Sequence, residues 1–76
     1  IELDPKDVIT CYNKGAALYG FHRYEEALEA FNKAIKINPR EALIWHSKGK
    51  ALSELNRTEE ADVAFAKAKE LGYKEE

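Results

Sequence analysis

The 76-residue sequence contains one cysteine, two prolines, four glycines and few β-branched residues. The single cysteine, Cys11, excludes an intrachain disulfide framework and a four-cysteine zinc site. The glycines are scattered, so they form no glycine-rich phosphate-binding loop. The shortage of β-branched residues and the absence of period-2 alternation predict no β-strand. The chain is also too short for a two-domain dinucleotide-binding enzyme or a (β/α)₈ barrel.

The sequence also lacks a basic excess and a long hydrophobic run. Its 12 Lys and Arg are set against 14 Asp and Glu, a formal net charge of −2, and the two signs alternate as on solvated helix faces. Nucleic-acid-binding proteins usually carry a basic excess or a basic stripe, so we expect no nucleic-acid partner. No apolar run approaches the roughly 20 residues that span a bilayer. We therefore expect no membrane contact and a cytoplasmic location.

Helix boundary signals are abundant instead. Hydrophobic residues make up 45% and charged residues 34% of the chain, enough of both to fold in water. Asp4-Pro5-Lys6-Asp7 and Asn38-Pro39-Arg40-Glu41 each combine an N-cap side chain, a proline at the first helical position and an acid at the third. These are strong helix-start signatures.

Turn residues mark the other boundaries. His22 and Asn56 tolerate the left-handed conformation that a turn between helices requires, and Gly72 is placed to end the last helix. Asn56 with Glu59 also fits a capping box. The sequence therefore predicts four helices, at 5–20, 24–37, 39–54 and 58–71.

The chain repeats itself with a period of 34 residues. Aligning 5–38 with 39–72 gives 13 identities in 34 positions, where average residue usage would give roughly three. Several of the shared residues suit two closely packed antiparallel helices. In the first copy the small residues Gly15, Ala27 and Ala34 allow close approach, and Leu18 and Phe31 fill the space between the helices. A helix–turn–helix unit with this period is typical of a solenoid.

The repeated residues resemble the tetratricopeptide repeat, whose pattern is W-x₂-L-G-x₂-Y, then A-x₃-F, then P. The second unit reads Trp45-x₂-Lys48-Gly49-x₂-Leu52 and Ala61-x₃-Phe65. The first reads Cys11-x₂-Lys14-Gly15-x₂-Leu18, Ala27-x₃-Phe31 and Pro39. The departures are Cys11 for the aromatic residue, lysine for leucine, leucine for tyrosine, and Tyr73 where a third proline would fall. The resemblance implies an all-α, right-handed α-solenoid of antiparallel helix pairs.

Two repeats, 5–38 and 39–72, account for most of the chain. Residues 1–4 match 35–38 at the same period, so we expect them to be the last turn of a preceding repeat's second helix, and residues 73–76 to be a tail.

The two ends of this array differ. Asp62 and Lys69 stand where the first unit has Leu28 and Ile35, so the last helix is expected to expose a polar capping face. Three residues of the first unit align with Ile44, Ala51 and Leu55 and are expected to be uncovered: Thr10, Ala17 and Phe21. We expect this face to cause weak self-association, or low thermal stability of the chain in isolation.

No arrangement of residues indicates catalysis. Cys11 with His22 or His46 could suggest a thiol nucleophile or a zinc site, but Cys11 occupies the position of Trp45 and is better explained as a small buried hydrophobe. Paired acids such as Glu25 and Glu26 fall in first helical turns, where the helix dipole favours them. We expect no active site, no metal and no cofactor.

A second apolar stripe on the first helix indicates a binding surface instead. The inward stripe is Val8, Cys11, Gly15 and Leu18, and about 100° around the helix lies a second one, Ile9, Tyr12, Ala16 and Tyr19. A surface helix needs only one apolar stripe, so the second must cover something. Either it lines a binding groove, or Tyr12 and Tyr19 pack on a missing repeat.

In the resembling family, first helices line a concave groove that holds peptides. The candidate groove residues are Ile9, Tyr12, Asn13, Ala16, Tyr19, Leu43, His46, Ser47 and Lys50. Some family members clamp the C-terminal carboxylate of heat-shock chaperones with Lys, Asn and Arg. Asn13 matches one such position, but Leu43 and Ser47 stand where Lys and Arg would be, so this specificity is not predicted.

The sequence therefore predicts a non-catalytic protein–protein interaction module that binds a peptide segment of a partner in this groove. Two other functions stay open: a nucleic-acid-binding helical repeat, and a regulatory or scaffold appendage of a larger enzyme.

Overall fold

The computed structural model describes residues 5–73, with side chains from residue 7, as four α-helices and no strand. The helices are α1 (Pro5–Gly20), α2 (Tyr24–Ile37), α3 (Ala42–Glu54) and α4 (Thr58–Glu70). The all-α prediction is confirmed, and the predicted bounds of α1 and α2 agree with the structure. The expectations for residues 1–4 and 74–76 lie outside the described residues.

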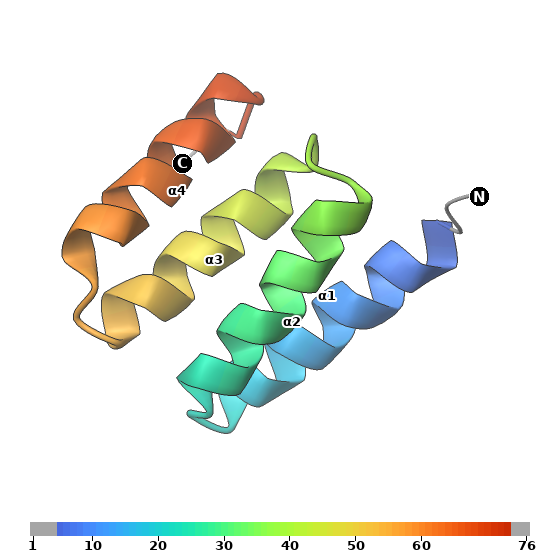
Figure 1. Ribbon diagram of the computed structural model, residues 1–76, viewed down its shortest axis with the longest axis horizontal. Coiled ribbons are helices and arrows are strands. Elements are labelled where there is room, and N and C mark those ends of the chain that lie inside the picture. The colour runs from blue at the N-terminus through green and yellow to red at the C-terminus, as the bar shows by residue number, and fades with distance from the viewer. Residues whose placement is uncertain (1–4, 74–76) are drawn as a thin grey trace.

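The helices form two antiparallel pairs that stack side by side (Figure 1). α1 packs on α2, α3 packs on α4, and α2 joins the pairs by packing on α3. α1 also approaches α3, whereas α2 and α4 do not approach each other within the described range. The first helices of the two pairs, α1 and α3, therefore lie closer together than the second helices, α2 and α4. The side formed by α1 and α3 is thus the inner, concave side of a helical-repeat solenoid.

Each pair contains a close glycine–phenylalanine contact at the same position of the repeat. A Cβ atom placed on Gly15 would lie 2.6 Å from Cε1 of Phe31, and one on Gly49 would lie 2.6 Å from Cε1 of Phe65. Phe31 is only 1% exposed. The alanines beside these contacts are buried as expected: Ala27, Ala34, Ala61 and Ala68.

The turns after α1, α3 and α4 have the same geometry. His22 (φ 64°), Asn56 (φ 62°) and Gly72 (φ 105°) all take the left-handed conformation that the sequence predicted. In each turn the following N–H donates 2.9 Å back to a carbonyl in the last helical turn, as in a Schellman motif: Arg23 to Leu18, Arg57 to Leu52, and Tyr73 to Ala68.

The predicted capping box at Asn56 is wrong. The N-cap residue of α4 is Arg57, with no side-chain capping hydrogen bond, because Asn56 is already used as the left-handed residue that ends α3. Arg57 pairs instead with Glu60 at 2.8 Å, and Arg23 pairs in the same way with Glu26 at 2.6 Å.

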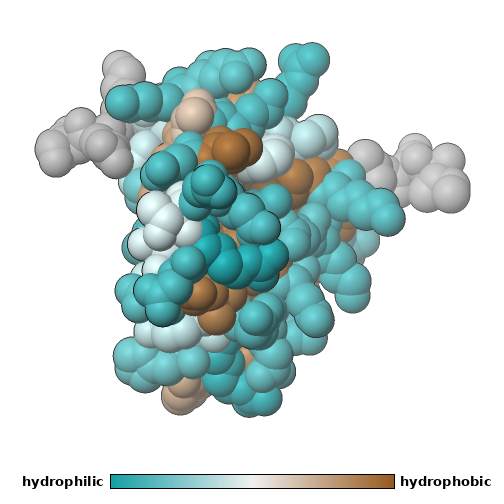
Figure 2. All heavy atoms as spheres, turned by 60° about the vertical axis from the view of Figure 1, so that its left-hand side comes forward, coloured by the Kyte–Doolittle hydropathy of each residue, from teal (hydrophilic) through white to brown (hydrophobic). Residues whose placement is uncertain are grey.

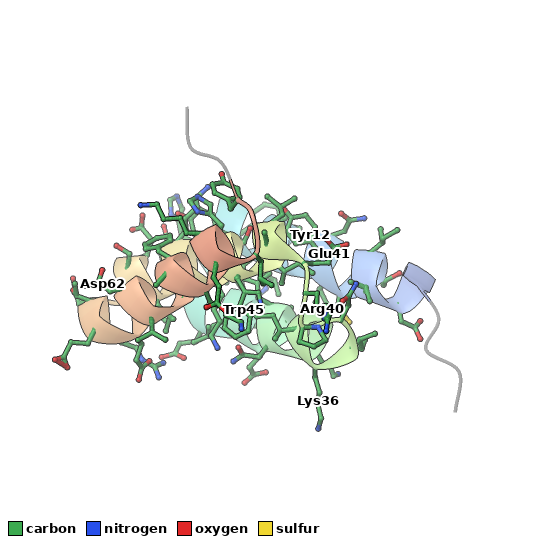
Figure 3. The ribbon with its side chains drawn as sticks, turned by 90° about the horizontal axis from the view of Figure 1, so that it is seen from above. Tyr12, Lys36, Arg40, Glu41, Trp45 and Asp62 are labelled. Atoms are coloured by element: carbon green, nitrogen blue, oxygen red, sulfur yellow. The ribbon has the colours of Figure 1, made fainter. Side chains whose placement is uncertain are left out.

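The prediction that the third helix begins at Pro39 is also wrong, because α3 begins at Ala42. The Trp45 Nε1–H donates to the Pro39 carbonyl at 2.8 Å, and the Arg40 N–H donates to Asn38 Oδ1 at 3.2 Å (Figure 3). The Pro39 carbonyl is thus bound by a side chain, and Glu41 stays extended as the N-cap residue. α1 carries Cys11 in place of Trp45 and does begin at its proline.

The two outer faces differ as expected. Leu28 is buried and Ile35 half-buried, whereas Asp62 and Lys69 are exposed. Figure 2 brings the α4 side forward and shows mostly hydrophilic side chains around small separate hydrophobic areas, and Figure 3 places Asp62 at the edge of the molecule. Thr10 and Ala17 of α1 are exposed, and Phe21, directly after α1, is 76% exposed. Their equivalents in the second repeat are buried or half-buried: Ile44, Ala51 and Leu55.

Replacing the glycine at each helix contact should have unequal effects. Gly15→Ala should lower the free energy of unfolding by about 1–3 kcal/mol, since overpacking outweighs the gain of about 1 kcal/mol in helix propensity. Gly49→Ala should cost less, because the half-buried Phe65 has room to move outward. Gly20→Ala is the control, since its Cβ would meet nothing within 4 Å. Urea unfolding measures all three, and equal stability of the Gly15 and Gly20 variants would contradict the contact's importance.

Making the α4 face resemble α2 should cause head-to-tail association. Asp62→Leu with Lys69→Ile recreates the stripe of Leu28 and Ile35, and the exposed face of α1 on another copy is equivalent to the α3 surface that this stripe covers. Sedimentation velocity should show growing oligomers, which Phe21→Glu in the same background suppresses. A double variant as monomeric as its parent would show that the two charges are not what caps this end.

The unmodified chain is expected to self-associate weakly through the α1 face. Phe21 is the large apolar side chain of that face, so Phe21→Glu should abolish the association. Ile9→Glu is the matched control, since Ile9 is another exposed apolar residue of α1 outside this face. Sedimentation equilibrium over a range of concentrations distinguishes the variants, and a concentration-independent monomer for the parent chain would refute the expectation.

Candidate functional site

Five of the nine candidate residues line one depression on the inner side of the molecule. Its walls come from both α1 and α3, its deepest residue is Phe31 of α2, and its volume is about 100 Å³. The candidates that line it are Tyr12, Ala16, Tyr19, Ser47 and Lys50. A depression with walls from both helix pairs therefore lies along the second stripe of α1.

A larger hollow, of about 320 Å³, lies between α1 and α2 and includes Cys11 and Lys14. Its counterpart between α3 and α4, of about 220 Å³, is lined by Trp45 and Lys48. The hollow is thus larger in the first repeat, where the small Cys11 side chain stands at the position of Trp45. Cys11 is half-buried beside it rather than fully buried as expected.

Tyr12 forms one wall of the depression and also belongs to the core. Its half-buried ring packs on Phe31 with the centroids 5.8 Å apart and the planes tilted by 38°. Figure 3 shows Tyr12 projecting from the upper side of the layer in that view. That side is formed by α1 and α3, so the ring meets Phe31 of α2 from the inner side of the layer.

Tyr19 links the C-terminal ends of α1 and α3. Its ring meets the edge of Tyr24 at 5.2 Å, the Lys50 Nζ lies 5.3 Å from its centroid, and its hydroxyl donates to Glu54 Oε2 at 3.4 Å. The pKa of Tyr19 is raised above its ordinary value, chiefly by burial and then by the negative charge of Glu54. The hydroxyl therefore stays neutral at physiological pH and available as a donor.

The other four candidates lie outside the depression. Ile9 and Leu43 occupy the same position of the two repeats and are 57% and 49% exposed, and Asn13 is exposed as well. His46 packs between two rings: Phe65 lies 5.2 Å from it, and Tyr73 stacks on it at 4.0 Å with an interplanar angle of 12°.

Sequence analysis missed the role of Tyr73, which it assigned to a tail. The available signal was Gly72: its left-handed conformation turns the chain back, and the Tyr73 N–H then bonds to Ala68. His46 and Tyr73 are 27 residues apart, so no local pattern could show that they stack.

The depression is lined by apolar, polar and charged side chains. Its lining combines aromatic rings, two small residues, and Lys50 as the charged member. Within residues 5–73, no group of three or more His, Cys, Asp and Glu side chains is placed to hold a metal ion. None of the helices described in that range has the length and apolar character needed to cross a membrane.

Comparisons with known protein families agree with the arrangement of helix pairs. Two models of the tetratricopeptide repeat match residues 8–41 and 30–62, which together include most of α1 and all of α2 and α3. No curated protein matches the chain at a significant level. The tetratricopeptide repeat is a non-catalytic unit of protein–protein interaction. Its pattern and its helix pairs are both present, and the chain belongs to the tetratricopeptide repeat family.

Proposed function

We propose that the chain binds a short peptide segment of a partner protein in the depression between α1 and α3. The observation that carries the proposal is the lining itself. Tyr12, Tyr19 and Lys50 converge there from two repeats around the buried ring of Phe31. Aromatic rings with hydroxyl tips supply apolar area and hydrogen-bonding groups at low entropic cost, as in other recognition surfaces.

Exposed apolar residues extend this surface along the inner side. Ile9 and Leu43 are repeat equivalents on α1 and α3, and each is about half exposed. Ile9 also lies on the same stripe of α1 as Tyr12. A peptide seated in the depression can continue across these two side chains. The surface is much smaller than the roughly 800 Å² per partner of a standard interface, so binding by this chain alone should be weak.

Charge gives the depression a preference among peptides. Lys50 lies over the ring of Tyr19 at the rim. Lys48, on the same helix, lies over Trp45 at 5.1 Å and belongs to a different surface. The proposed ligand therefore carries an apolar anchor and a nearby acidic group that meets Lys50. The net charge of −2 gives no comparable support to the alternative of a nucleic-acid ligand.

Filling the depression should strongly weaken peptide binding while the fold stays intact. Ala16→Leu places a larger side chain in the depression, and Ala17→Leu is its control, since Ala17 is equally an exposed alanine of α1 but lies outside the depression. Peptides selected on the unmodified protein from a random display library should bind A17L normally and bind A16L at least about tenfold more weakly. Fluorescence anisotropy measures the affinities, and circular dichroism checks the fold.

A second pair of variants tests the charge. Lys50→Gln should weaken binding of the acidic peptides about two- to fivefold and flatten its salt dependence, whereas Lys48→Gln, with the same charge change, should do neither. Truncating Tyr12 is a poorer test, because its contact with Phe31 makes the ring part of the core. Selected peptides that bind A16L and A17L equally well would place the recognition surface elsewhere and refute the proposal.

A further inference from the structure

We infer that the peptide residue seated in the depression is aromatic and is accompanied by an acidic residue. The inference rests on the proposed function and names the class of ligand. Its main support is a contact that the protein makes with its own chain: Tyr73 stacks on His46, which in turn packs on Phe65. The second repeat thus already holds an aromatic side chain against its first helix.

The first repeat contains the same two inner rings without the third. Tyr12 and Phe31 are the equivalents of His46 and Phe65, 34 residues earlier in each case, and they pack at 5.8 Å. The space beside Tyr12 is the depression, because Ala16 and Ser47 are too small to fill it. A ligand ring placed there would make with Tyr12 the contact that Tyr73 makes with His46.

The size of the depression suits one ring. An engineered cavity of about 150 Å³ lined by apolar side chains binds benzene. The depression measures about 100 Å³, which is less than this cavity, but it opens to solvent, so one six-membered ring can enter it with its edge or its polar tip outside. Tyr12 and Tyr19 both belong to its walls, so a ring can contact aromatic groups of two helical turns.

The charge at the rim selects the neighbouring residue. The Lys50 Nζ lies above the Tyr19 ring at 5.3 Å, at the depression and on the opposite helix from Tyr12. A carboxylate within one or two residues of the ligand's aromatic side chain would meet this ammonium group. The chain's own sequence supplies a peptide of this type, since Tyr73 is followed by Lys74, Glu75 and Glu76.

The probe is therefore a synthetic peptide with the sequence of residues 71–76, acetylated and amidated so that its carboxylates are those of the two glutamates. It is titrated into the ¹⁵N-labelled 76-residue protein and followed by amide chemical shifts. We expect saturable shifts at Ala16, Tyr19 and Ser47. Replacing the peptide's tyrosine by leucine should weaken binding about three- to tenfold, and by alanine still further. Replacing both glutamates by glutamine should weaken it about two- to fivefold.

The variants A16L and A17L locate the binding. A16L should lose the shifts produced by the tyrosine peptide, and A17L should keep them. If the tyrosine and leucine peptides bind the depression equally, the aromatic anchor is refuted while the proposed function stands. Shifts confined to His46 and Phe65 would mean that the peptide only displaces Tyr73, which also refutes the inference. If none of the peptides binds, the inference fails, and the affinities of the display-selected peptides for A16L and A17L decide the proposed function separately.

Discussion

The close approach of glycine to phenylalanine within each helix pair is the contact on which the rest of the structure depends. Gly15 and Gly49 leave room for the rings of Phe31 and Phe65 where even a methyl group would lie 2.6 Å from a ring carbon. This contact sets how near α1 lies to α2 and α3 to α4. It also sets the depth of the depression, because Phe31 is both the buried ring of the first pair and the deepest lining residue.

Both repeats contain this glycine–phenylalanine contact, but the residues around it differ. These differences determine which surfaces of each repeat are hollow, charged or covered. Trp45 fills the side of α3 and binds the preceding loop, whereas Cys11 leaves a hollow beside α1. α4 exposes two charged residues, Asp62 and Lys69, where α2 has the buried Leu28 and the half-buried Ile35. Tyr73 covers His46, while the equivalent Tyr12 borders an open depression. The two repeats thus form one inner surface with two different halves. In the first repeat the aromatic residues border an open depression, and in the second Tyr73 covers the equivalent position.

The depression is lined by residues that also stabilise the fold. Tyr12 packs on Phe31, and Tyr19 joins α1 to α3 through Lys50 and Glu54. Since these contacts hold the rings before any ligand arrives, little side-chain entropy remains to be lost on binding. The small side chain of Ala16 leaves the depression open between these rings.

The sequence by itself determined the features that depend on local spacing. Helices at 5–20 and 24–37, left-handed residues at His22 and Asn56, and a glycine opposite each phenylalanine follow from the periodicity and the repeat, because each reflects the conformation of a few neighbouring residues. Only the tertiary structure decided where α3 begins, because the Trp45 side chain binds the Pro39 carbonyl after the chain has folded back. It also decided which of the predicted groove residues meet. Ile9, Asn13 and Leu43 lie outside the depression, and His46 is stacked under Tyr73, since packing between helices, rather than the pattern along one of them, determines what lies beside each side chain.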